Sequence, residues 1–359
     1  MAQSNGSMAV WCTCRQGPSV PSYEVHLNYW RVAGRKREGC VAHSTDFLEI
    51  GILIQDPQSI TSINIFTPKP VTIDQLSDLG SRFLDPDLAQ GIFNESLKCI
   101  GSGSGSSWIE LQRKNQNLFC RVHSFAKIKG GQIDNSELEL ENVDGGTLIK
   151  ILPHAIASSS NNLGADDRLY FRLRLLMGDE RGSPFVKVIT PIDNKFQSGF
   201  EEIEYIDFRI NESRTLPDNI NRRMQQYVNK GIASLDVVAF LAAVPVSSEL
   251  SVSHTQFHKN RLLEDVPWTN YAPNPLPEGM VVYHWKKSQA NIESFAAFVK
   301  LQTRRSGGRT IVWYLLIAFL FGILGNLTAS AVQHYFGLFQ DTPQKSLEQP
   351  ADQKDQKAG

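Results

Sequence analysis

The stretch "RRSGGRTIVWYLLIAFLFGILGN", residues 304–326, divides the chain into two parts of different physical character. From Ile311 to Val332 the sequence contains no Asp, Glu, Lys or Arg. A helix needs about 20 apolar residues to cross the hydrocarbon core of a bilayer, and aromatic pairs at 313–314 and 335–336 suit the two interfaces. The sequence therefore predicts a transmembrane helix over 311–332 rather than a buried core helix, which would be amphipathic.

The charges on the two sides of this helix predict its orientation. Residues 304–310 form a basic juxtamembrane joint with Arg304, Arg305 and Arg309, whereas the first positive charge after the helix is Lys345. Positive flanks stay on the cytoplasmic side, so we expect the N-terminal domain to be cytoplasmic and the tail to lie on the opposite side. The tail, 340–359, is polar and predicted to be disordered.

The composition limits the classes of partner. The chain has 36 basic and 37 acidic side chains, and this balance argues against binding of long nucleic acid by bulk charge. Its five cysteines, an odd number, favour a reduced compartment over a disulfide framework. The basic triplet 35–37 is interpreted as a solvated loop, with contact to anionic lipid headgroups as the alternative.

Short alternating runs dominate the sequence before the span, which predicts an α+β domain rich in antiparallel strands. We expect a polar N-terminal segment at 1–21 and a β-rich subdomain at 22–155 with helices near 73–93. A loop at 156–167 is a candidate boundary before an α+β subdomain at 166–303.

Two helices are predicted within this second subdomain. The run "LPDNINRRMQQYVNKG" has helical spacing, with Asp218 as its N-cap and Gly231 just past its end. A second helix is expected from about Ser288, because 292, 295, 296 and 299 share a helical face.

Two strands have complementary charge patterns. "RLYFRLRL" places Arg168, Arg172 and Arg174 on one face, and "ELELE" places Glu137, Glu139 and Glu141 on one face. One interpretation is that the charges are solvated and pair across strands. The alternative is that the three arginines bind a small anionic ligand, because guanidinium groups match phosphate and carboxylate geometry.

The cysteines supply a metal-site hypothesis. Cys12 and Cys14, together with Cys40 and His43, are four ligands of types that zinc accepts, but their spacing matches no common zinc motif. We predict no cofactor, with structural zinc as the alternative.

Two polar clusters are candidates for catalysis. His254 and His258 have the spacing of one helical face, but Thr255 occupies the place of a zincin glutamate. Asp207 and Glu212 lie among arginines in "DFRINESR", a pattern that also fits a structural ion-pair group.

The span itself carries small residues at helical spacing. Ala318 and Gly322 are four residues apart, as are Gly325 and Ala329, and such spacing allows helices to approach closely. Asn326 adds a polar group that can bond between helices.

These observations favour a non-enzymatic, membrane-anchored sensing or binding protein. Its trigger would be a ligand or a partner, and its effect would follow from association of its spans, for example in stress or antiviral defence. A membrane-tethered hydrolase or nuclease and a membrane-recruiting scaffold are the alternatives. The expected partners are the bilayer, a second copy or another protein, and a small anionic ligand.

Overall fold

The computed structural model describes most of the chain before the span and the span itself. The described residues are 6–32, 45–101, 107–128, 130–177, 183–189, 201–228, 230–253, 257–263, 268, 271–273, 276, 279–304 and 308–337. They belong to two units: a β-rich domain that ends at Arg304, and a second unit that contains the C-terminal helix.

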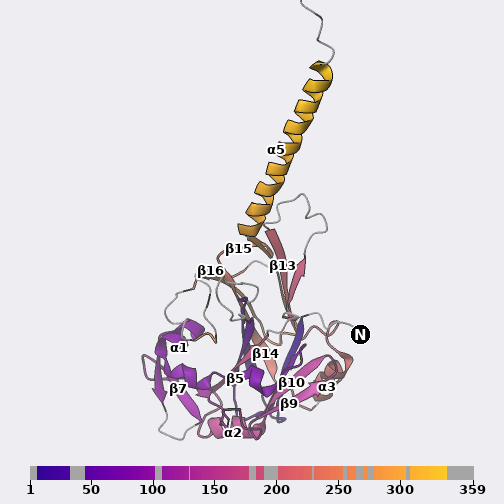
Figure 1. The fold of residues 1–359 in the computed structure, drawn as a ribbon. Helices are drawn as coiled ribbons and strands as arrows, with labels where there is room; N and C mark the ends of the chain where they lie inside the picture. The colour runs from indigo at the N-terminus through magenta and orange to yellow at the C-terminus, as the bar shows by residue number, and fades with distance from the viewer. Residues whose placement is uncertain are drawn as a thin grey trace, which may run out of the picture. The chain divides into compact units, whose positions relative to one another are not determined.

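Most of the domain consists of two mixed sheets (Figure 1). In the described residues, the eight-stranded sheet contains, in spatial order, β15 (Ser248–Ser253), β18 (Phe295–Arg304), β13 (Glu201–Ile210), β1 (Ser7–Cys14), β4 (Ile60–Thr67), β10 (Gly146–Ile151) and β9 (Leu138–Val143), with β12 (Val186–Ile189) beside β13. The ten-stranded sheet contains β16 (Lys259–Leu262), β17 (Met280–Ser288), β14 (Ser234–Pro245), β2 (Ser22–Trp30), β3 (Phe47–Gln55), β11 (Arg168–Leu176), β8 (Leu118–His123), β7 (Trp108–Arg113) and β6 (Leu97–Gly101), with β5 (Leu76–Asp78) beside β11.

Parallel pairs occur where strands distant in sequence meet. β1 pairs with β13, β2 with β14, and β8 with β11 in parallel, and the other strand pairs are antiparallel. The α+β class is therefore confirmed, with sheets that are mixed rather than purely antiparallel. Each sheet takes strands from both predicted subdomains, 22–155 and 166–303.

The main core lies between the two sheets. Alternate residues of β1 and β4, such as Val10 and Ile63, share one apolar cluster with alternate residues of β2 and β14, such as Leu27 and Phe240. Period-two alternation places these side chains on the inner face of each sheet, and the two sheets therefore form a sandwich.

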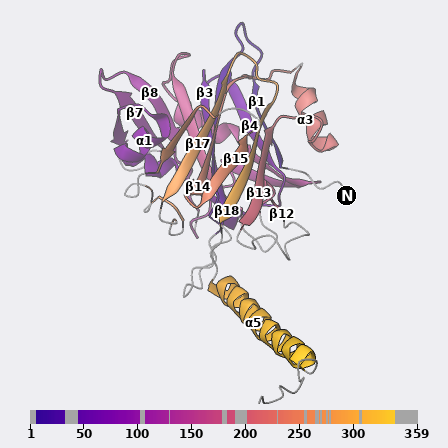
Figure 2. The same ribbon diagram turned by 90° about the horizontal axis from the view of Figure 1, so that it is seen from above.

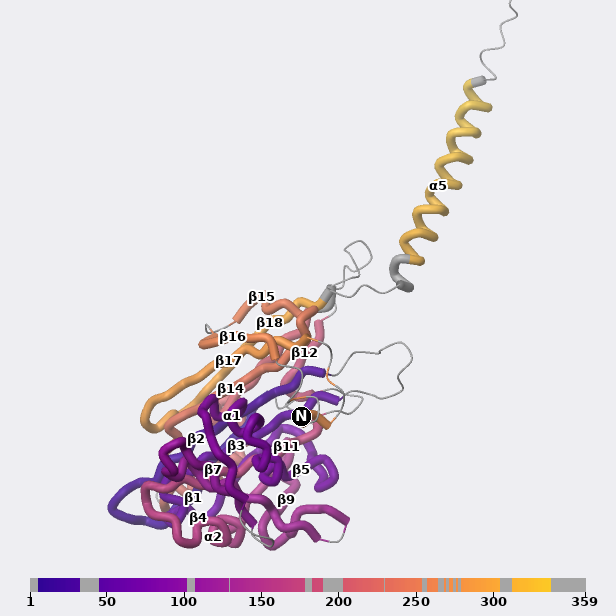
Figure 3. Tube along the Cα trace, turned by 90° about the vertical axis from the view of Figure 1, so that its left-hand side faces the viewer, coloured from indigo at the N-terminus to yellow at the C-terminus, as the bar shows by residue number. Residues whose placement is uncertain are grey.

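Helices and further chain cover the outer faces. The described helices of the domain are the 3-10 helices η1 (Ile73–Gln75) and η2 (Gly80–Leu84), and the α-helices α1 (Pro86–Phe93), α2 (Pro153–Ser160) and α3 (Asp218–Val228). The helix α5 (Gly308–Gly337) belongs to the other unit. α1 and α3 lie on opposite sides of the domain (Figures 1 and 2), and α2 packs beside β4 (Figure 3). On the α3 side, Ile220 packs with Trp11 and Phe66.

Four local predictions are corrected. Residues 7–14 of the supposed polar segment 1–21 form β1, whose residues are all buried, because an apolar strand at the centre of a sheet needs no alternation. The helix expected from Ser288 is wrong, since β17 ends there and 295–304 form β18. The expected loop at 156–167 begins inside α2, and α3 begins at Asp218 itself rather than after it.

The last unit is a 30-residue helix, α5. Its stretch Val312–Phe336 has a mean hydropathy of 2.1, and the side chains of this stretch are exposed. The helix α5 is long and apolar enough to cross a membrane. At both ends it extends a few residues beyond the predicted range 311–332.

Candidate functional site

A cavity of about 610 Å³ opens beside β5 and β11 of the ten-stranded sheet. Among the residues that line it are Ser77, Asp78, Arg82, Lys127, Arg174 and Tyr271. Arg174 and Tyr271 are buried, whereas Arg82 and Lys127 are exposed. The cavity thus has an arginine in its wall and two further cations at its rim. Its volume lies within the range of small-molecule binding sites.

Arg174 belongs to a buried polar network on the outer face of this sheet. Glu49 of β3 accepts hydrogen bonds from Arg174 Nε (3.0 Å) and Nη2 (2.7 Å), and from Arg172 Nη2 (2.5 Å). Tyr271 Oη donates to the same carboxylate at 2.9 Å. The antiparallel register places Arg174 directly opposite Glu49, so the contacts between these two residues follow from strand pairing.

The network holds more positive than negative charge. Glu49 and Arg172 are fully buried and Arg174 is 5% exposed, so one carboxylate faces two guanidinium groups. Neutral hydroxyls of Tyr170 and Tyr271 complete the contacts of Arg172. Both guanidinium groups are hydrogen-bonded, but burying this net positive charge is costly.

Arg174 also retains unused donors. In the described part of the chain, the hydrogen bonds of Arg174 run from Nε and Nη2 to Glu49. Its Nη1 makes none of these bonds, and it is not one of the buried side-chain atoms. Its guanidinium carbon lies 4.5 Å from the ring centre of Tyr271 and 4.9 Å from that of Phe47. The rings hold the group in place while Nη1 stays accessible.

Asp78 is the acid of the cavity lining. Burial raises its pKa to about 6, although hydrogen bonds from Gly80 N and Ser124 Oγ and the charge of His123 oppose this shift. Set against Arg82, Lys127 and Arg174, this one carboxyl leaves the lining with a net positive charge at neutral pH.

The structure separates the three predicted arginines. Arg172 and Arg174 share the Glu49 network, but Arg168 lies near Phe119, with its guanidinium carbon 5.7 Å from the ring centre. The solvated interpretation is wrong for Arg172 and Arg174, because α1, η2 and the chain around Trp268 and Tyr271 cover this face of the sheet.

The predicted pairing with "ELELE" does not occur. β9 and β11 belong to different sheets. Glu141 instead bonds Arg223 of α3 and Lys150 of β10, and Lys150 Nζ also lies 3.6 Å from Glu139. Glu137 is buried and bonds the backbone N–H of Ala126 at 2.7 Å.

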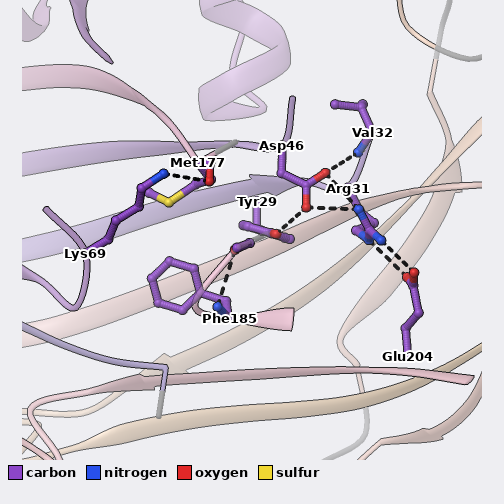
Figure 4. Close-up of polar contacts among 9 residues, drawn as sticks. Tyr29, Arg31, Val32, Asp46, Lys69, Met177, Phe185 and Glu204 are labelled. Carbon is purple, nitrogen blue, oxygen red and sulfur yellow. Dashed lines mark hydrogen bonds and ion pairs between the residues drawn. The ribbon is translucent and has the colours of Figure 1, made fainter. Parts of the chain in front are cut away.

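A second buried network links the two sheets (Figure 4). Arg31, just after β2, donates through Nε and Nη2 to Glu204 of β13, at 3.0 and 2.5 Å. It also donates to Asp46 through Nη1, and Asp46 accepts from Tyr29 Oη at 2.6 Å and from Val32 N at 2.8 Å. One guanidinium here bridges two carboxylates and joins the two sheets, so the geometry of this network favours a structural role. No signal in the sequence pointed to it, because its members lie 15 and 173 residues apart.

A buried serine, histidine and glutamate have the residue types of a catalytic triad. Ser159 Oγ lies 2.6 Å from His123 Nδ1, and His123 Nε2 lies 3.4 Å from Glu137 Oε2. Ser159 and His123 are fully buried and Glu137 is 3% exposed. Because Ser159 is buried, no substrate can reach its hydroxyl, and the three side chains cannot act as a catalytic triad. The Ser159–His123 contact instead stabilises the packing of α2 against β8.

The other catalytic candidates fall into separate places. Asp207 bonds Arg209 at 2.7 Å, and Glu212 bonds Arg214 at 2.5 Å and lies 3.4 Å from Arg209. This is the ion-pair group that the sequence allowed as the simpler interpretation. His254 lies outside the described residues, and the His258 ring lies 5.9 Å from that of His284. Burial and, after it, the nearby cationic groups, beginning with His258, together lower the pKa of His284 to about 4.

Of the four residues proposed as zinc ligands, the structure describes two. Cys12 and Cys14 pack into the core between the sheets, and burial raises the pKa of both thiols. Cys40 and His43 lie outside the described residues, as does the basic triplet 35–37. Within the described ranges, no group of three or more His, Cys, Asp or Glu side chains is placed to hold a metal ion.

The small residues of the span share one side of α5. Ala318, Gly322, Gly325 and Ala329 follow a four-three-four spacing, which keeps them on one helical face. A Cβ built on Gly322 or Gly325 would meet nothing within 4 Å. Asn326 is exposed on the helix, and Thr328 Oγ1 bonds the carbonyls of Leu324 and Gly325.

Comparison with known proteins gives no functional assignment. No protein-family model matches the sequence, and no curated protein is significantly similar to it.

Proposed function

We propose that this chain is a membrane-anchored, non-enzymatic binding protein whose β domain takes a small anion into the cavity beside Arg174. In this proposal α5 crosses the membrane once, the domain is cytoplasmic and the tail lies on the far side. Ligand binding would then act through association of the spans.

The proposed anchor rests on α5. Its apolar stretch of 25 residues corresponds to about 37 Å of helix at 1.5 Å per residue, which is enough for a bilayer core of about 30 Å. The proposed orientation rests on Arg304, Arg305 and Arg309, which precede the span, and on the distance in sequence to Lys345.

The observation that carries the anion proposal is the excess buried positive charge around Glu49. Arg174 offers unused N–H groups at the cavity wall, and Arg82 and Lys127 add charge at its rim. Arginine donors in a fixed plane suit carboxylate or phosphate oxygens. Low exposure in the wall strengthens such contacts relative to those at an open surface.

The described catalytic candidates support the non-enzymatic part of the proposal. Ser159 is fully buried, and Asp207 and Glu212 are engaged with neighbouring arginines. None of these groups lines the cavity.

Titration of inorganic phosphate tests the ligand class. The full chain in phosphatidylcholine nanodiscs would be titrated by calorimetry, alongside the double variant Arg82→Gln/Lys127→Gln and the control Arg214→Gln, whose side chain is 83% exposed in a different part of the domain. Exposed charge pairs contribute about 0.2–1 kcal/mol each. The double variant should therefore bind phosphate about twofold to thirtyfold more weakly, and the control should bind like the unmodified chain.

Two results would contradict the proposal. One is the absence of saturable phosphate binding to the unmodified chain. The other is equal affinity of the double variant and the Arg214→Gln control, which would place the bound phosphate outside the cavity.

A further inference from the structure

One end of the sandwich is the end from which the chain continues into α5. β18 finishes at Arg304, which pairs with Glu201 at the start of β13, and Thr303 pairs with Ser248 at the start of β15. Pro245, at the end of β14, pairs with Met280 of β17. Because only two residues separate β14 of one sheet from β15 of the other, the two sheets end together here. We call this end of the sandwich the exit end, and Figure 2 shows these strands side by side.

Several large aliphatic side chains are exposed at the exit end. Val246, in the turn after β14, is 55% exposed and bonds Gly279 through its backbone N–H. Leu262 of β16 is 64% exposed and pairs with Val281. Val188 and Ile189 of β12 are 46% and 41% exposed, and Ile189 pairs with Ile203, two residues into β13.

Covalent connection limits how far this end can lie from a membrane that contains α5. Three residues separate Arg304 from Gly308, the first residue of the helix. Four Cα–Cα steps span at most about 15 Å. A domain with so short a connection presents its exit end to the bilayer surface rather than its opposite end, where β3 finishes at Gln55 and β11 begins at Arg168.

We propose that the exit end rests on the bilayer, with Val246, Leu262, Val188 and Ile189 inserted among the lipid headgroups. This inference rests on the membrane anchor of the proposed function but not on the anion cavity. Exposed aliphatic side chains enter the headgroup boundary because this removes apolar area from water. Lys187 is exposed near them and favours anionic lipid, while Glu249 is an exposed acid at the same end.

Single fluorophores on the full chain test this docking. Cys40 and Cys99 would be replaced by Ser, since Cys12, Cys14 and Cys120 are buried. An environment-sensitive probe would then be attached in Val246→Cys or Leu262→Cys. Val20→Cys is the matched control, because Val20 is 68% exposed and precedes β2 at the opposite end.

The labelled chains would be compared in liposomes of phosphatidylcholine and of phosphatidylcholine with phosphatidylglycerol, with a quencher on the headgroups. We expect blue-shifted emission and severalfold stronger quenching at 246 and 262 than at 20, with a larger difference in the anionic liposomes. Equal emission and quenching at all three positions would overturn the proposal.

A lengthened connection separates docking from mere proximity. Insertion of twenty Gly and Ser residues after Arg304 removes the short tether but leaves the exit end unchanged. Quenching at 246 and 262 should persist, and its loss would show that the tether alone brought the probes to the lipid. Alkaline carbonate extraction of the same samples reports on the anchor separately: a chain released from the liposomes would contradict the membrane span of the proposed function as well as the docking.

Discussion

Glu49 is the residue on which the charge of the cavity wall depends. It accepts hydrogen bonds from two arginines and from Tyr271, and it has no exposed surface. Removing one member of a buried ion pair leaves the other charge without compensation, which costs more than the pair itself contributes. The carboxylate therefore both stabilises the sheet and fixes the guanidinium of Arg174 at the cavity.

Glu49→Gln should lower the free energy of unfolding by about 3–5 kcal/mol, because two guanidinium groups would remain buried beside a neutral amide. Urea unfolding of the full chain in detergent, followed by circular dichroism, measures the change. Glu139→Gln is the control: that side chain is 52% exposed, and its loss should change stability by less than about 0.5 kcal/mol. Equal stability of the two variants would contradict the charge excess described here.

Individual strands show where sequence reasoning succeeds and where it stops. The alternation of "RLYFRLRL" correctly predicted β11 and its inward leucines, since Leu169, Phe171 and Leu173 all lie in the core. It could not show that a further layer covers the opposite face. That layer comes from α1 and from residues near 268–272, and periodicity within one strand contains no information about chain so distant.

β18 illustrates a different limit. Ile292, Phe295, Ala296 and Val299 have helical spacing, but in the sheet Phe295, Ala297, Val299 and Leu301 point into the core. A run rich in apolar residues satisfies both periods, and pairing with β13 and β15 decides between them. The cavity was accessible to sequence reasoning only through Arg174, because Arg82 comes from η2 and Lys127 from the chain after β8, both distant in sequence from β11.

The span is the element whose sequence was most informative, because its length and composition predict it without reference to any neighbour.

If helices associate through the face that bears Gly322 and Gly325, then Gly322→Ile and Gly325→Ile should each block close approach of the backbones. Crosslinking of the full chain in membranes should show at least a severalfold loss of dimer. Ile323→Leu, on another face of the helix, is the control and should leave the amount of crosslinked dimer unchanged. If crosslinking is unchanged in all three variants, the span acts only as a membrane anchor.

At the scale of the whole domain, the Arg31 network joins the sheets to each other. Arg31 follows a strand of the ten-stranded sheet, and Glu204 lies in the eight-stranded sheet. Their charge-assisted hydrogen bonds at the edge of the sandwich core (Figure 4) add a geometric constraint that apolar packing between sheets does not supply.

Arg31→Met should lower the free energy of unfolding by about 3–5 kcal/mol, because Asp46 and Glu204 would stay buried and lose the guanidinium group that they share. Arg113→Met is the matched control, since Arg113 and its partner Glu95 are each 41% exposed, and surface pairs contribute at most about 1 kcal/mol. Parallel urea titrations of both variants measure the difference, and a loss in Arg31→Met no larger than in the control would contradict the structural role.

The central positions of β1 and β2 have a consequence for the synthesis of the chain. Each of these strands pairs in parallel with a strand that is made much later, and Val10 N bonds a side chain 201 residues away. At about 5–20 residues per second, the partner strands emerge roughly 10–40 s afterwards. The nascent chain must therefore carry unpaired, apolar strand edges for that whole interval, and truncation before residue 201 should yield aggregates rather than a smaller folded domain.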